Sequence, residues 1–266
     1  YKILKILPQQ LQSFLRGFQF KMWIKILQLL TFSIPSITSQ TCMPTVTTAS
    51  GRKAPRNFCS GQLIFEDNFD SFDFSTWSHE IFMGGPVNWE FQVYVNSRDN
   101  SFVENGNLHI RPRLTSDYYG ESFLSGGFVD LSSNCTHVDK ARCYRQATPE
   151  NIISPIRSAR IRTRNAFAFK YGVLEVRAKM PLGDWLWPAI WLVPSRSLYG
   201  PWPVSGEIDL VEARSNKNLL SGKINVGSAR VESTLHFGPS SKFNGWKTAH
   251  FAKNSGANPS FNEDFH

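Results

Sequence analysis

The chain has 266 residues, of which 41% are hydrophobic and 19% are charged, so its composition excludes wholesale disorder. Its length suits one β-sandwich domain or two small domains. The net charge of +8 is concentrated in residues 1–40, which hold five Lys or Arg and no acid. Because the rest of the chain has no dense basic run, the charge pattern argues against binding to nucleic acid.

Residues 1–39 have the pattern of upstream sequence followed by a secretory signal peptide. Met22 is followed by Lys25, by the apolar run 26–34 and by small residues. This run is too short and too interrupted for a membrane span. We therefore expect translation to start at Met22 and the mature protein to be secreted, free of any membrane. A buried amphipathic helix is the alternative interpretation.

The four cysteines agree with secretion. Cys42 and Cys59 are 17 positions apart, and Cys135 and Cys143 are 8 apart. An even number of cysteines in an oxidising compartment indicates two local disulfides, although three pairings are possible. Asn134 begins an Asn-Cys-Thr sequence that could accept a glycan. No group of His and Cys has the spacing of a zinc site, so we expect no metal and no cofactor.

Strand and turn patterns dominate the chain from Thr41 onward. Residues 40–60 are rich in Thr, Ser and Pro and are predicted to form an N-terminal arm, whereas residues 61–266 are predicted to form one domain. Apolar residues at 91, 93 and 95 alternate with polar ones, as in a half-buried strand. Residues 102–110 are typical of a β-hairpin, because Asn105-Gly106 readily adopts positive φ.

The clearest strand pattern covers residues 171–180. Its even-numbered positions from Leu174 to Met180 are apolar, whereas Glu175, Arg177 and Lys179 are charged. A stripe of arginines in 160–164 is interpreted as a solvated or ligand-facing sheet surface. Predicted strands recur with Gly, Pro and Asn between them. No apolar pattern with the 3.6-residue period of a helix occurs after the predicted signal peptide. The sequence therefore predicts an antiparallel all-β sandwich.

Three carboxylates in one apolar strand are the strongest functional signal. Glu207 and Asp209 are two positions apart and share one face of a strand. Simple alternation would send Glu212 to the opposite face, with Ile208 and Leu210. We expect a β-bulge to return Glu212 to the face of the other two acids, since bulges are common beside active sites. Two convergent carboxyls suit glycoside hydrolysis with retention, whereas a solvent-exposed acidic strand is the alternative.

Aromatic residues crowd the sequence before these acids. Trp185, Trp187, Trp191 and Trp202 all lie within this region. Aromatic faces stack on sugar rings, so tryptophans near carboxylates favour an oligosaccharide site. Core packing is the alternative for each of them, and a structural role is the alternative for His236.

The chain resembles glycoside hydrolase family 16, in its branch of laminarinases and invertebrate β-1,3-glucan-binding proteins. The Glu-Ile-Asp-Leu-Val-Glu segment is similar to the family signature, and the resemblance extends over about residues 61–266. Further segments that match in type and order are 63–70, 88–94, 171–179, 187–191 and 233–239. The resemblance implies a concanavalin-like β-jelly roll with an open cleft across its concave sheet.

This resemblance also implies roles for individual residues. Glu207 would be the nucleophile, Glu212 the general acid/base, and Asp209 would orient the nucleophile. Four more side chains would bind substrate: Trp187 and Trp191 as stacking walls, His236 beside the acids, and Arg177 toward sugar hydroxyls.

The resemblance implies a secreted, retaining endo-β-1,3-glucanase that acts on β-1,3-glucan, and we expect a monomer. Because relatives in this branch often lose catalytic glutamates, a non-catalytic glucan-recognition protein of innate immunity is the alternative, and a lectin-like or structural sandwich is a third. Some relatives bind calcium, but no calcium site is predicted here. Ala213 and Ser215 depart mildly from the family pattern. Residues 261–266 resemble the start of a further strand, so C-terminal strands are expected to be missing.

Overall fold

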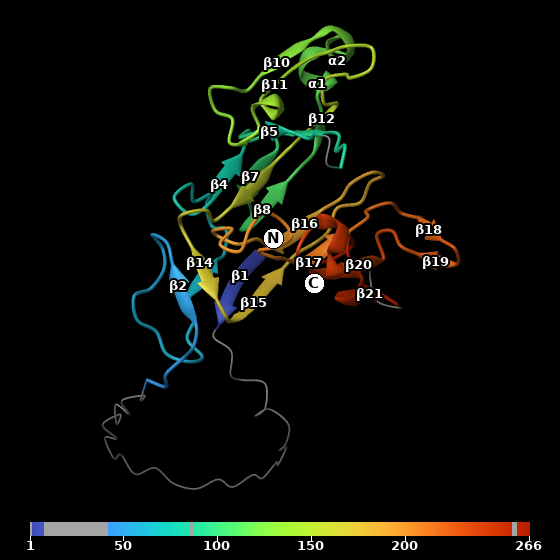
Figure 1. The fold of residues 1–266 in the computed structure, drawn as a ribbon. Helices are drawn as coiled ribbons and strands as arrows, with labels where there is room; N and C mark the ends of the chain where they lie inside the picture. The colour runs from blue at the N-terminus through green and yellow to red at the C-terminus, as the bar shows by residue number, and fades with distance from the viewer. Residues whose placement is uncertain (1, 8–41, 86–87, 257–259) are drawn as a thin grey trace, which may run out of the picture.

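The computed structural model describes residues 2–7, 42–85, 88–256 and 260–266, and most of its regular structure is β-strand (Figure 1). The predicted signal peptide, with Met22 and the apolar run 26–34, lies outside the described residues. Within the described ranges, no helix combines the length and apolar character that crossing a membrane requires.

Three larger sheets organise the described chain. The first has the order β15-β1-β3, the second β5-β6-β12-β9 and the third β16-β17-β20-β21. All their strand pairs are antiparallel except β6 and β12, which are parallel. In sheet order the strands are β15 (Val173–Arg177), β1 (Lys2–Leu7), β3 (Phe65–Asp67); β5 (Phe82–Met83), β6 (Gln92–Tyr94), β12 (Ile156–Ser158), β9 (Arg113–Leu114); and β16 (Ala189–Leu192), β17 (Glu207–Ala213), β20 (Arg230–His236), β21 (His250–Asn254).

Smaller elements complete the described fold. The two-stranded sheets are β10 (Phe128–Asp130) with β11 (Tyr144–Gln146), β13 (Arg160–Arg162) with β4 (Ser78–Glu80), β14 (Ala168–Lys170) with β2 (Thr48–Ser50), β18 (Leu220–Ser221) with β19 (Ile224–Asn225), and β7 (Ser101–Glu104) with β8 (Asn107–Ile110). The short helices are α1 (Ser116–Tyr119), α2 (Ser122–Gly126) and the 3₁₀ turns η1 (Lys140–Arg142), η2 (Ser241–Phe243) and η3 (Gly245–Thr248).

The predicted hairpin is confirmed. Strands β7 and β8 pair antiparallel, with Glu104 opposite Asn107. The two residues between them, Asn105 and Gly106, have φ of 52° and 65°. Positive φ at both central positions matches the twist of the flanking strands, which explains why an Asn-Gly pair stands there.

The alternation predicted for 171–180 is confirmed, although the strand itself is shorter. Ala178 and Met180 are buried beside Ala213 of β17, whereas Glu175 and Arg177 are exposed. Beyond Arg177 the backbone continues to pair, since the N–H of Ala178 donates to the carbonyl of His266. This cluster packs on one face of the sheet of β17, and the three acids lie on the other face.

The half-burial predicted for residues 91–95 holds only in part. Val93 and Val95 are buried, but Phe91 is 58% exposed. Strand β6 starts only at Gln92, so Phe91 lies in the connection before the sheet and the alternation does not reach it.

Two segments that were expected outside the sandwich contribute strands. Strand β1 pairs through its backbone with both β15 and β3, and β2, from the predicted arm, pairs with β14. The cysteines form two local disulfides, Cys42–Cys59 and Cys135–Cys143, which resolves the three possible pairings. The first of them closes a loop that contains β2.

We expect Phe65→Ala to lower the free energy of unfolding by about 3–5 kcal/mol. Phe65 is 9% exposed, and its ring centroid lies 4.6 Å from that of Phe167, in the cluster with Ile64. Urea unfolding followed by circular dichroism measures the change. Phe251→Ala, at a side chain that is 68% exposed, is the control and should change stability by less than about 0.5 kcal/mol. Equal losses in both variants would contradict this packing.

Candidate active site

A break in the register of β17 brings the acids together. Against β20, Glu207 pairs with His236 and Asp209 with Thr234, and the register then shifts before Glu212 pairs with Glu232. The pairing with β16 shifts at the same place. The predicted bulge is therefore confirmed, and it offsets the ordinary alternation that would separate Glu212 from the other two acids.

Asp209 is the most deeply buried of the three acids. Its residue is 3% exposed, and its Oδ2 lies 3.2 Å from Nε2 of His236. Burial, followed by the charges of Glu207 and Glu212, raises the pKa of Asp209 to about 7, although His236 opposes this shift. Below that pH Asp209 is neutral, so the cluster carries less negative charge than three carboxylates would.

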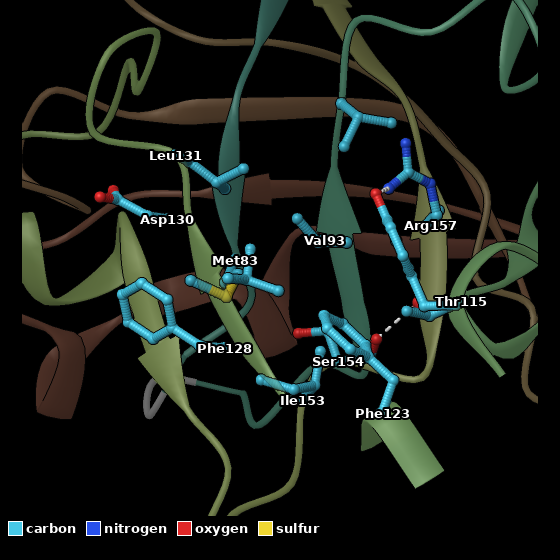
Figure 2. Close-up of a pocket in the computed structure, with 13 residues that line it drawn as sticks. Met83, Val93, Thr115, Phe123, Phe128, Asp130, Leu131, Ile153, Ser154 and Arg157 are labelled. Atoms are coloured by element: carbon cyan, nitrogen blue, oxygen red, sulfur yellow. Dashed lines mark hydrogen bonds between the residues drawn. The ribbon is translucent and has the colours of Figure 1, made fainter. Parts of the chain in front are cut away.

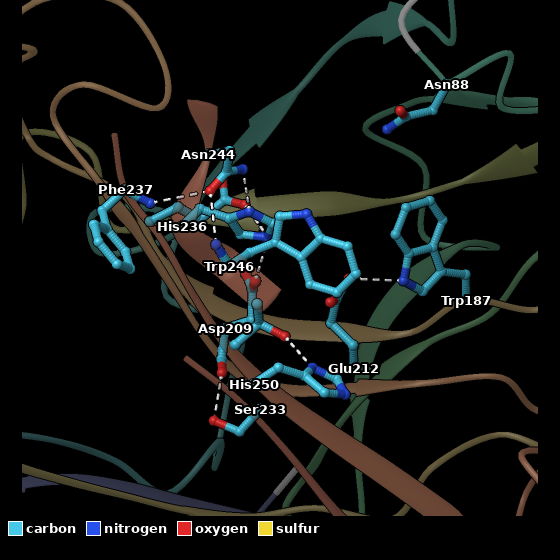
Figure 3. A network of polar contacts seen from close by, with 12 residues as sticks. Asn88, Trp187, Asp209, Glu212, Ser233, His236, Phe237, Asn244, Trp246 and His250 are labelled. Atoms are coloured by element: carbon cyan, nitrogen blue, oxygen red, sulfur yellow. Dashed lines mark hydrogen bonds and ion pairs between the residues drawn. The ribbon is translucent and has the colours of Figure 1, made fainter. Parts of the chain in front are cut away.

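Asn244 orients the ring of His236, as Figure 3 shows. The Oδ1 of Asn244 accepts hydrogen bonds from the backbone N–H groups of Phe237 and Trp246, at 3.3 and 3.2 Å. Its amide nitrogen therefore points the other way and donates to Nδ1 of His236 at 2.8 Å. A neutral imidazole that accepts at Nδ1 carries its proton on Nε2, which can donate to Asp209.

Several groups act on the pKa of Glu207 in opposite directions. Its Oε1 lies 3.7 Å from Nε2 of His236, and its side chain is 16% exposed. Burial, followed by the charge of Glu212, raises the pKa of Glu207 above its ordinary value, although Arg160 and a hydrogen bond from Trp202 oppose this rise. The last two groups favour the ionised carboxylate, which is the form that a nucleophile needs.

Glu212 has a tryptophan partner of its own. The indole N–H of Trp187 donates to Oε1 of Glu212 at 2.8 Å (Figure 3). Trp187 therefore has a polar contact with an acid, in addition to the stacking role expected from the sequence. Its side chain is 57% exposed, so much of the indole stays open to solvent.

Trp191 and Arg177 lie in different surroundings. Trp191 is opposite Asp209 in the register of β16 and β17, which puts both side chains on one face of the sheet. Arg177 lies on β15, and its guanidinium carbon is 4.6 Å from the ring centroid of Phe265. No contact identified in the described ranges joins Arg177 to the acids, so its role in binding sugar hydroxyls stays a prediction.

Comparison with known proteins agrees with this arrangement. Residues 127–254 match the model of the XgeA-like, catalytic GH16 domain. These residues belong to glycoside hydrolase family 16. The laminarinase catalytic domain from Thermotoga maritima superposes on the chain with a TM-score of 0.54 at 27% identity, over 77% of this chain and 67% of that one. The predicted all-β jelly roll of family 16 is confirmed.

Curated relatives of this chain carry names of binding proteins. The β-1,3-glucan-binding protein of Penaeus monodon is 48% identical over 210 residues, which cover 77% of this chain and 56% of the relative. The β-1,3-glucan-binding protein 1 of Manduca sexta is 40% identical over 178 residues, which cover 64% of this chain and 36% of the relative. The chain thus spans about half or less of the length of these relatives.

Three groups around the acids make contacts that the sequence did not predict. Asn244 lies eight positions after His236, in the turn that leads into η3. Arg160, whose charge lowers the pKa of Glu207, comes from a different sheet. For Trp202 the dense run of tryptophans is a signal, but nothing in the sequence shows that its indole would meet Glu207.

A cation could be held by part of the same cluster. One ligand atom from each of Glu207, Asp209 and His236 lies within 4.8 Å of the others. These groups also contact one another directly, which accounts for their proximity without an ion.

A separate apolar cavity of about 310 Å³ lies near α1, α2 and β10 (Figure 2). Met83 and Ile153 are fully buried in its wall, and the hydroxyl of Thr115 donates to the carbonyl of Ser154 there. Its lining contains none of the three acids of β17. The cavity is therefore separate from the carboxylate cluster.

We expect Asp209→Asn to change the pH dependence of stability. Between pH 4 and about 7, unfolded Asp209 is ionised but folded Asp209 keeps its proton, so the folded state binds more protons and the stability contributed by this group falls as pH rises. The unfolding free energy of the wild type, measured relative to the Asn variant, should therefore decline across this window and level off above it.

Ser233→Ala is the matched control for this prediction. Its hydroxyl donates to the backbone carbonyl of Asp209, so the change removes a local hydrogen bond but no titratable group. Its stability curve should run parallel to that of the wild type. A pH-independent difference between the wild type and Asp209→Asn would contradict the raised pKa.

Proposed function

We propose that this protein is a secreted, monomeric endo-β-1,3-glucanase that hydrolyses its substrate with retention of anomeric configuration. The observation that carries the proposal is the bulge in β17, which returns Glu212 to the side of Glu207 and Asp209. Two carboxylic acids with different partners on one sheet face suit the roles of nucleophile and general acid. The similarity to laminarinase domains supports β-1,3-glucan as the substrate.

The reaction would proceed in two displacements. Glu207 attacks the anomeric carbon while Glu212 gives its proton to the departing glycosidic oxygen, which forms a glycosyl-enzyme. Glu212 then takes a proton from water, and this water attacks the anomeric carbon and frees Glu207. Asp209, protonated below about pH 7, limits the negative charge beside Glu207 and so helps the nucleophile to stay ionised.

Substrate binding would draw on the aromatic side chains around the acids. Trp187 and Trp191 would stack on sugar rings, and His236 would border the reacting sugar. The large exposed fraction of Trp187 supports this role, because a stacking surface must be open to the ligand.

Glucan recognition without cleavage is the second candidate. The names of the curated relatives favour it, since those from Penaeus monodon and Manduca sexta are glucan-binding proteins. Against it stands the presence of both Glu207 and Glu212, together with the hydrogen bond from Trp187 that positions Glu212.

Hydrolysis of laminarin by the purified full-length protein tests the proposal. We expect new reducing ends, and proton NMR of the first product should show the β anomer. Laminarin that is bound but left intact would favour the recognition protein. An α anomer as the first product would contradict the two-displacement mechanism.

A further inference from the structure

An ion-pair network around the buried Glu80 connects a second sheet to the sheet that carries the acids of β17. Strands β13 and β4 pair so that Arg160 lies opposite Glu80. The carboxylate of Glu80, whose side chain is only 8% exposed, pairs with Nε of Arg160 through Oε2 and with Nη1 of Arg162 through Oε1, at 2.7 Å. Two arginines of the stripe, which the sequence indicated to be a solvated or ligand-facing surface, therefore share a buried acidic partner.

Arg160 also reaches across to Trp191. Its guanidinium carbon lies 4.4 Å from the centroid of the Trp191 ring, within the range of a cation–π contact. The register with β17 puts Trp191 on the same sheet face as Asp209. One face of the Trp191 indole is thus covered by the guanidinium, so a sugar ring would have to stack on the other face.

We propose that Glu80 and Arg160 are positioning residues for the reaction: Glu80 holds the guanidinium of Arg160, and this guanidinium holds the indole of Trp191 beside the acids. The inference rests on the proposed function, because Trp191 is taken there to stack on the glucan. Glu80 acts only through Arg160. Its substitution should therefore change the environment of Trp191, although no direct contact between Glu80 and Trp191 is found in the described residues. The positive charge of Arg160 also lowers the pKa of Glu207.

The first experiment reads Trp191 directly and needs no catalysis. The protein is labelled with 5-fluorotryptophan, and Trp191→Phe identifies the resonance of Trp191 among the eight tryptophans. We expect Arg160→Met and Glu80→Gln both to shift or broaden this resonance. Arg162→Met is the matched control, because it removes the other arginine partner of Glu80 and should leave the resonance in place. An unchanged resonance in Arg160→Met would overturn the proposal.

The second experiment measures laminarin kinetics as a function of pH. For Arg160→Met we expect KM to rise about three- to tenfold, and the acidic limb of kcat/KM to move to higher pH, because the pKa of Glu207 rises when the nearby cation is lost. Arg160→Lys keeps the charge and an ion pair with Glu80, which protects the fold. It should therefore restore the acidic limb but not KM, and a wild-type KM would contradict the role of the flat guanidinium.

A double-mutant cycle tests whether Glu80 and Arg160 affect KM through the same contact or independently. If Glu80 acts through Arg160, the double variant Glu80→Gln/Arg160→Met should have the same KM as the single variant Arg160→Met. Additive effects would overturn the inference. If the wild-type protein cleaves no laminarin, the proposed function fails, but the Trp191 resonance still decides whether Glu80 and Arg160 position this indole.

Discussion

Glu207→Gln is expected to lower the rate of laminarin hydrolysis at least roughly a thousandfold. The amide is nearly isosteric with the carboxylate but cannot form the glycosyl-enzyme, so a whole step is lost. The partners of Glu207, namely His236 and Trp202, can still contact the amide oxygen. We therefore expect laminarin binding to stay close to that of the wild type. Initial rates of reducing-end release and calorimetric titration measure the two quantities.

The same substitution at an exposed strand position gives the matched control. Glu175 lies on β15, exposed on the polar side of its strand, and Glu175→Gln should keep the wild-type rate. If Glu207→Gln kept more than about one per cent of the wild-type activity, Glu207 would not be the covalent nucleophile. A parallel loss in both variants would indicate damage to the fold instead.

Glu212→Ala is expected to have the second largest effect. Hydrolysis of laminarin should fall roughly a hundred- to ten-thousandfold, because the departing sugar oxygen would leave without a proton. An aryl glycoside with a dinitrophenolate leaving group needs no such proton, so its glycosyl-enzyme should still form. Added azide should then attack this intermediate and release a β-glycosyl azide, which NMR identifies.

The azide products distinguish the two acids. In Glu207→Ala no glycosyl-enzyme forms, and azide would attack the activated glycoside directly from the opposite side to give the α-glycosyl azide. Glu212→Ala should give the β product. The same anomer from both variants would contradict the assignment of nucleophile and acid/base.

Local sequence patterns predicted the strand that carries the three acids. Glu207 and Asp209 share a face because side chains alternate with a period of two, which depends only on neighbouring residues. The unfavourable placement of Glu212 beside Ile208 and Leu210 indicated the bulge, and the paired registers confirm it. The hairpin at Asn105 and Gly106 was equally readable, since its turn conformation is a property of these two residues.

Contacts between distant segments could not be derived in this way. The exposure of Phe91 depends on where β6 begins, and the pairing of Cys42 with Cys59 was one of three possibilities. Strand β2 is a further example: its residues have weak strand signals, and they form a strand only because β14 supplies backbone partners.

The sequence by itself determined the β-sandwich class, the three acids of β17 and the β-bulge that groups them. Each follows from short-range periodicity and from the cost of burying a carboxylate. Only the tertiary structure decided which groups surround these acids. Trp202 meets Glu207, Asn244 orients His236, and Arg160 arrives from another sheet. These neighbours depend on how whole sheets pack and on the paths of the loops between them, which local sequence does not encode.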